Sequence, residues 1–110
     1  MSVVIAERAL EYFGDDGVQP GFARVCLPFD EGRNWRCDYH LAWPGYDYKR
    51  YACGEDSWQA LQLAMQIIPV QISISEAFKS GQLGWLGGRL NTKAELVRWL
   101  APKSMDVLDK

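Results

Sequence analysis

The stretch YACGEDSWQAL at residues 51–61 gathers a cysteine, two carboxylates and a hydroxyl where a predicted strand ends and a predicted helix begins. The free amides and partial positive charge of a helix N-terminus lower the pKa of a thiol and attract anions. Cys53 is therefore the residue best placed for nucleophilic chemistry. Glu55 and Asp56 oppose this role, because their carboxylates repel a thiolate and occupy the same amides. We interpret the stretch mainly as a structural junction.

The other reactive residue types do not form a catalytic or metal-binding set. His40 is the single histidine, and the three cysteines lack the short spacing of zinc ligands. Cys37 and His40 differ by an odd number of positions, so a regular strand directs them to opposite faces and they cannot pair as nucleophile and base. Asp38 and His40 would share one face as a solvated polar pair. We predict no catalytic residue, no metal and no cofactor.

The composition is typical of a folded globular domain. Of 110 residues, 48% are hydrophobic and 24% are charged, unlike the composition of disordered chains. The net charge of −2 and the scattered basic residues argue against nucleic-acid binding. We see no membrane span and no signal-peptide pattern, and the odd number of cysteines favours reduced thiols. We expect a cytoplasmic protein that binds neither nucleic acid nor membrane.

Residues 1–54 are predicted to form the sheet. Residues 35–43 alternate most clearly, with Arg36, Asp38 and His40 directed toward solvent. The residues of this run that would face a core are Trp35, Cys37, Tyr39, Leu41 and Trp43. The turn-forming residues at 14–21 are predicted to connect the first two strands. Four sequential strands with short connections favour an antiparallel meander.

A helix is predicted to cover one face of this sheet. Asp56 can act as its N-cap, and Gln59 three residues later completes a pattern similar to a capping box. An apolar stripe follows at helical spacing. Its members are Trp58, Leu61, Met65 and Ile68, widened by Ala64 and Ile67.

Pro69 is expected to break this helix, because proline lacks an amide hydrogen and clashes with the preceding turn. Ser73 and Glu76 have the spacing of a capping box for a second, short helix. Residues 56–80 are therefore predicted to be one broken helix or a helix pair.

The glycine-rich residues 81–91 are predicted to be a closing loop or a short strand in which Leu83, Trp85 and Leu86 pack. Residues 92–101 are predicted to be a short C-terminal helix. We find no internal repeat or linker, so residues 1–110 are predicted to be a single domain. The predicted fold is α+β, with a four-stranded antiparallel meander covered on one face by a helix that is broken near Pro69.

Three segments resemble a family of short bacterial proteins of uncharacterised function. They are IAER at residues 5–8, WRCDY at residues 35–39 and GEDSWQALQLAMQ at residues 54–66. The resemblance covers roughly the first 88 residues and implies no activity, substrate or catalytic residue.

The sequence favours a protein-binding role without enzymatic activity, because aromatic and charged side chains are abundant while catalytic groups are not. The candidate interaction residues are Arg36, Asp38, His40, Trp43, Tyr46 and Tyr48. Small size and bacterial type suggest, by analogy, an immunity protein or antitoxin that neutralises a bacterial toxin by contact.

Two alternatives remain open on the sequence. One is a small-ligand-binding protein or enzyme with a pocket between helix and sheet, near Tyr51, Cys53 and Trp58. The other is a homodimer, in which the chain pairs with itself through sheet edges or through the solvent-facing side of the sheet.

Overall fold

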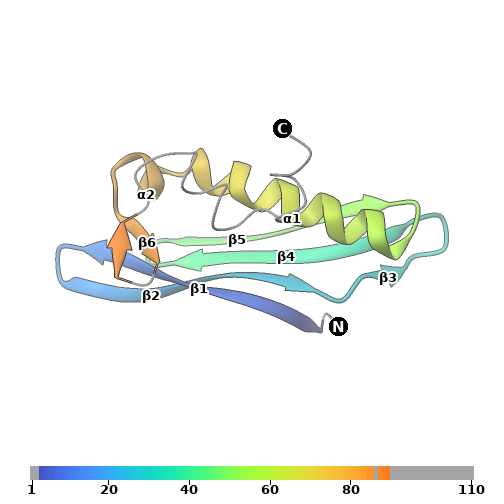
Figure 1. Ribbon diagram of the computed structural model, residues 1–110, viewed down its shortest axis with the longest axis horizontal. Helices are drawn as coiled ribbons and strands as arrows, with labels where there is room; N and C mark the ends of the chain where they lie inside the picture. Colours follow the sequence, from blue (N-terminus) through green and yellow to red (C-terminus); the bar gives the residue numbers. More distant parts are fainter. Residues whose placement is uncertain (1–2, 86, 90–110) are drawn as a thin grey trace.

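The computed structural model describes residues 3–85 and 87–89, which form an antiparallel sheet with one long and one short helix (Figure 1). The predicted α+β class is confirmed. The elements are β1 (Val4–Gly14), β2 (Gly17–Cys26), β3 (Phe29–Asp30), β4 (Trp35–Trp43), β5 (Tyr46–Gly54), α1 (Ser57–Ser73), α2 (Glu76–Lys79), β6 (Leu83–Trp85) and β7 (Gly88–Arg89).

The four long strands β1, β2, β4 and β5 form the predicted meander, in which each strand pairs with the next in an antiparallel direction. Within the described residues the sheet nevertheless has seven strands, so the predicted number of four is wrong. Three strands of two or three residues extend it: β3 pairs with β4, β6 with β1, and β7 with β6. Strands this short contain too few residues for a periodic pattern.

Of the two predictions for residues 81–91, a closing loop or a short strand, the structure has short strands there, β6 and β7. Leu83 and Gly84 of β6 pair with Tyr12 and Glu11 of β1. The amide of Phe13 also donates to the Gln82 carbonyl at 2.7 Å. The side chain of Leu83 is fully buried, so this segment completes the core rather than only closing the chain.

The first hairpin is tighter than the predicted connection at residues 14–21. Only Asp15 and Asp16 form the turn, and Gly17 has the positive φ of 108° that such a turn requires. Strand β2 therefore continues through Pro20. Strand β4 pairs with β2 only at Phe22–Val25. Near Pro20, β2 therefore has no second neighbouring strand among the described residues, and no hydrogen bond to β4 requires the amide hydrogen that proline lacks.

The start of α1 follows the prediction. The Asp56 carboxylate accepts from the Gln59 amide at 2.8 Å, and the Gln59 side chain accepts from the Glu55 amide at 2.7 Å. The predicted break at Pro69 is wrong, since α1 continues to Ser73. Pro69 is buried, as are Ile68 and Ile72 of the same helix, and this packing outweighs one lost hydrogen bond.

The break comes later, and Ser75 rather than the predicted Ser73 caps α2. The Ser75 hydroxyl accepts from the Phe78 amide at 3.3 Å and donates to the Ile72 carbonyl at 2.6 Å. The predicted helix at residues 92–101 lies outside the described residues.

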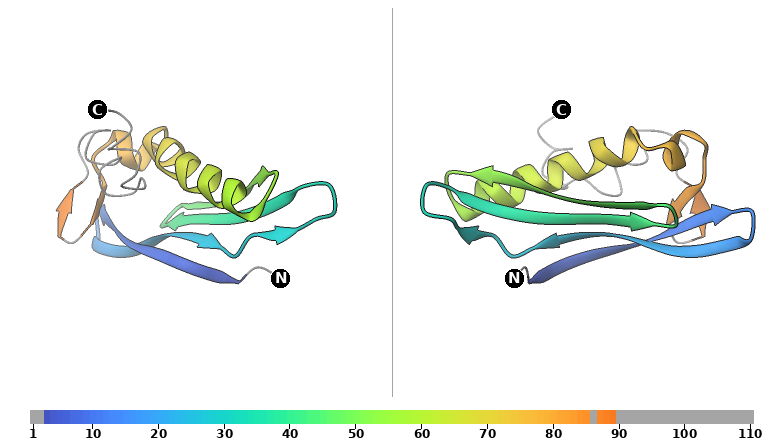
Figure 2. Two further views of the ribbon diagram at one scale, coloured as in Figure 1. Left: turned by 45° about the vertical axis from the view of Figure 1, so that its right-hand side comes forward. Right: turned by 180° about the vertical axis from the view of Figure 1, so that it is seen from behind.

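Helix α1 packs mainly on β4 and β5 (Figures 1 and 2). Ala64 and Ile68 of the predicted stripe are buried, together with Ala60 and Ile72, whereas the predicted member Trp58 is 78% exposed. The cause is the close approach of the helix to Gly54, where an added Cβ would lie 2.4 Å from the Ala60 nitrogen. Only small side chains fit beside such a contact.

Candidate functional site

The two faces of the sheet differ in cover. On β4, the side chains of Cys37, Tyr39 and Leu41 are buried on the face that α1 packs against, while Arg36 and His40 point to the opposite side. Among the described residues no helix lies on that opposite side (Figure 2). We call this side the open face. Its central residues are Glu7, Phe22, Arg24, Arg36, Asp38, His40, Asp47, Lys49 and Tyr51.

One row of polar residues crosses four strands of the open face. The register places Glu7 opposite Arg24, Arg24 opposite His40, and His40 opposite Lys49. Arg24 Nε donates to the Glu7 carboxylate. The strand pairing therefore fixes the order of charges along the row, because opposed residues in an antiparallel pair share a face.

The Phe22 ring contacts two members of this row. The Arg24 guanidinium lies 3.6 Å from the centre of the Phe22 ring, and His40 contacts the same ring edge-on at 4.9 Å between centroids. His40 Nε2 also pairs with the Asp47 carboxylate. That hydrogen bond lowers the pKa of Asp47.

Arg36 is the centre of a second cluster. Its Nε donates to Asp38 Oδ1 at 2.7 Å, and its Nη1 lies 3.6 Å from Glu31 Oε2. The guanidinium lies 4.0 Å from the centre of the Tyr51 ring and 5.7 Å from that of Phe29. The hydrogen bond with Asp38 raises the pKa of Arg36. Arg36 is therefore charged and held in one orientation on an exposed surface.

The two clusters border a shallow depression of about 570 Å³, whose lining includes Arg24, Arg36, His40, Lys49 and Tyr51. Arginine and tyrosine in such a position are typical of protein interfaces. The structure thus brings together three of the six predicted interaction residues, Arg36, Asp38 and His40.

The other three predicted interaction residues lie on the packed face. Trp43 is 6% exposed and stacks on Tyr46, with 4.2 Å between ring centroids. Tyr46 stacks in turn on Tyr48 at 5.9 Å, and both tyrosines pack partly buried against the core. These aromatic residues fill the space between the sheet and the C-terminal half of α1, where Gln71 donates to the Tyr46 hydroxyl at 3.4 Å.

The predicted pocket near Cys53 is divided between separate surfaces. Tyr51 lines the open-face depression, Cys53 lines another depression of about 410 Å³ beside Arg33 and Glu55, and Trp58 is exposed on α1. Gly54 and the start of α1 leave no space for a side chain between them. No described pocket is lined by all three predicted residues.

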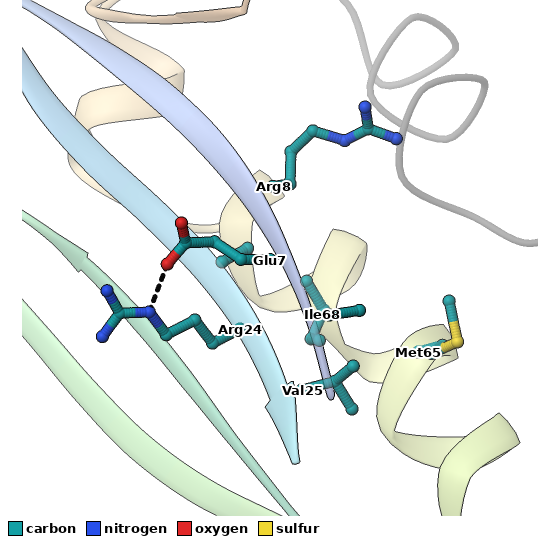
Figure 3. A pocket seen from close by; sticks show the side chains of 8 residues that line it. Glu7, Arg8, Arg24, Val25, Met65 and Ile68 are labelled. Atoms are coloured by element: carbon teal, nitrogen blue, oxygen red, sulfur yellow. Dashed lines mark hydrogen bonds and ion pairs between the residues drawn. The ribbon is translucent and has the colours of Figure 1, made fainter. Parts of the chain in front are cut away.

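A further groove of about 250 Å³ lies where α1 leaves β1 and β2 uncovered (Figure 3). Met65 and Ile68 of α1 face Val25 of β2 there, while the paired Glu7 and Arg24 side chains extend away to the other side. The groove is mostly apolar and brings no reactive groups together. Sequence reasoning missed it, because its position depends on where the helix lies over the sheet.

The buried cysteines have no reactive environment. Burial raises the pKa of the Cys37 thiol to about 11, and this thiol donates to the Cys26 carbonyl at 3.3 Å. In the described part of the chain, no three His, Cys, Asp or Glu side chains gather as metal ligands would. The described residues also contain no helix that is both long and apolar enough to cross a membrane.

These features define a small α+β domain with one face packed under a helix and one face that carries ordered arginine and aromatic side chains. The chain belongs to the family described as a domain of unknown function, DUF6968, whose sequence model matches residues 6–96. No curated protein and no solved structure matches the chain.

Proposed function

We propose that the chain is a protein-binding domain without enzymatic activity and that its partner docks on the open face. The supporting observation is the Arg36 cluster beside the depression of about 570 Å³. Arg36 is already held by Asp38 and Tyr51, so binding would cost little side-chain entropy. A fixed arginine at the rim of a depression is a typical binding hot spot.

In its most concrete form, the proposal is an immunity protein or antitoxin that neutralises a bacterial toxin by contact, in the cytoplasm. Three cysteines that form no disulfide agree with that compartment. The natural partner to test is the product of a neighbouring gene.

The test measures the affinity of the purified chain for that gene product by titration calorimetry. Replacing Arg36 with alanine should weaken binding at least about tenfold, the cost of a hot-spot residue. Arg8→Ala is the matched control, because Arg8 also stacks on an aromatic ring, Trp85 at 3.9 Å, but on the packed face. A complex that tolerates Arg36→Ala as well as Arg8→Ala, or the absence of any complex, would contradict the proposal.

A second candidate function is small-ligand binding in the same depression. Its volume of about 570 Å³ lies within the range of roughly 300 to 1,000 Å³ that ligand pockets occupy. A ligand would raise the melting temperature of the wild type but not of Arg36→Ala. Cys53→Ser should leave this shift unchanged, because Cys53 lies in a different depression.

A further inference from the structure

Helix α1 carries no charged residue in the 17 positions from Ser57 to Ser73. A helix on the surface of a soluble domain normally has charged residues opposite its buried stripe. Here the residues outside the buried stripe are glutamine, serine and further apolar side chains. Such depletion of charge is typical of the centre of a protein interface.

A second apolar stripe runs along the flank of α1, beside the buried stripe. Its members are Leu63, Ile67, Val70 and Ile74, separated by four, three and four residues. Leu63 is partly buried against the core, whereas Ile67, Val70 and the C-cap residue Ile74 are 37%, 60% and 56% exposed. Alternating steps of four and three residues place side chains along one seam, as in helices that pair with another helix.

The stripe is also symmetric in sequence about the point midway between Ile67 and Val70. If a second copy of α1 lies antiparallel on the first, Ile67 meets Val70 of the copy and Leu63 meets Ile74 of the copy. A two-fold axis thus brings apolar residues together at all four contacts, as a self-complementary interface requires.

We infer that this stripe is a homodimer interface in which α1 packs antiparallel on α1 of a second copy. Charge supports a second copy over a charged partner, because a charged side chain buried against this neutral helix would lack an opposite charge. The inference is independent of the proposed function, since the open face lies on the other side of the sheet.

A contact through one helix of 17 residues is small. Stable complexes bury roughly 800 Å² on each partner, and smaller interfaces bind weakly. The dimer should therefore form at concentrations of tens to hundreds of micromolar.

The first test is sedimentation equilibrium of the full chain over about 10 to 500 µM, the range that suits a small interface. Val70→Lys should raise the dimer dissociation constant at least about tenfold, since it places a charged side chain in each of the two apolar contacts between residues 67 and 70. Gln62→Lys is the matched control, because Gln62 is exposed on α1 but lies off the stripe. Both variants should unfold in urea like the wild type. A chain that is monomeric throughout, or a dimer equally unaffected by both substitutions, would overturn the inference.

The second test examines the register by disulfide formation. In a Cys53→Ser background, which removes the exposed native thiol, chains with Ile67→Cys and chains with Val70→Cys are oxidised separately and as a mixture. The inferred pairing predicts that the mixed disulfide forms fastest. Fastest crosslinking of either variant with itself would overturn the antiparallel register.

Discussion

Adjacent residues of β4 have opposite roles in this protein. Leu41 is completely buried beneath α1, while His40 beside it points to the open face and pairs with Asp47. The packed face is stabilised by removal of apolar surface from water. The open face is organised by ion pairs and ring contacts, which contribute little to stability when exposed. One face therefore determines the fold, and the other is free to carry a binding surface.

The two faces should differ most in stability when Leu41 and His40 are each truncated to alanine. We expect Leu41→Ala to lower the free energy of unfolding by about 2 to 5 kcal/mol, because it leaves a cavity in the core. His40→Ala should cost less than about 1 kcal/mol, the value of an exposed pair. Urea denaturation of both variants measures the difference. Equal losses would mean that the open face also belongs to the folding core.

Substitutions of the last two residues of β5, Cys53 and Gly54, should also differ in their effect on the free energy of unfolding. Gly54→Ala should destabilise the protein by about 1 to 3 kcal/mol, because it overpacks the contact between sheet and helix. The added Cβ would meet backbone atoms of Gln59 and Ala60, which cannot rotate away. Cys53→Ala at the adjacent exposed position is the control and should change the free energy of unfolding by less than about 0.5 kcal/mol. Comparable urea midpoints for the two variants would contradict the close approach of α1.

The difference between the two faces was largely predictable from the sequence. The period-two pattern of residues 35–43 correctly separates Cys37, Tyr39 and Leu41 from Arg36 and His40. The Asp56 cap was also predictable, since it depends only on residues within one helical turn. Both signals are local, and local chemistry determines them.

The errors concern contacts between distant elements. The sequence pattern does not reveal that α1 approaches Gly54 so closely that Ala60 is buried and Trp58 is exposed. It also does not reveal that Tyr46 stacks on Trp43 toward the core, although both are residue types that interfaces favour. The partners of Arg36 on the open face follow from strand register, which also brings Tyr51 beside Asp38.

The cysteines of the two faces should differ in reactivity. Because burial raises the pKa of Cys37 from 9.0 to about 11, its thiolate fraction at pH 8 falls about 100-fold, and alkylation should slow by at least that factor. Cys53 is exposed and should react first with iodoacetamide, as mass spectrometry of the native protein would show. The neutral Cys37 thiol stabilises the fold fully below pH 9.0, and this contribution is lost as pH rises toward about 11. Alkylation of Cys37 as fast as Cys53 would show that the packed face opens readily.

The smallest expected effect concerns the pair of His40 and Asp47 on the open face. The hydrogen bond from His40 lowers the pKa of Asp47 from its ordinary value of 3.8. A lowered pKa stabilises the fold above the ordinary value, and this stabilisation is lost as pH falls through the folded-state pKa. His40→Ala should return the Asp47 pKa toward 3.8, as an NMR titration of its carboxyl carbon would detect. The change in stability should be slight, because the Asp47 side chain is 68% exposed. An Asp47 pKa that stays the same in His40→Ala would mean that the open face is less ordered in solution than its contacts imply. The proposal of a preorganised binding surface on this face would then lose support.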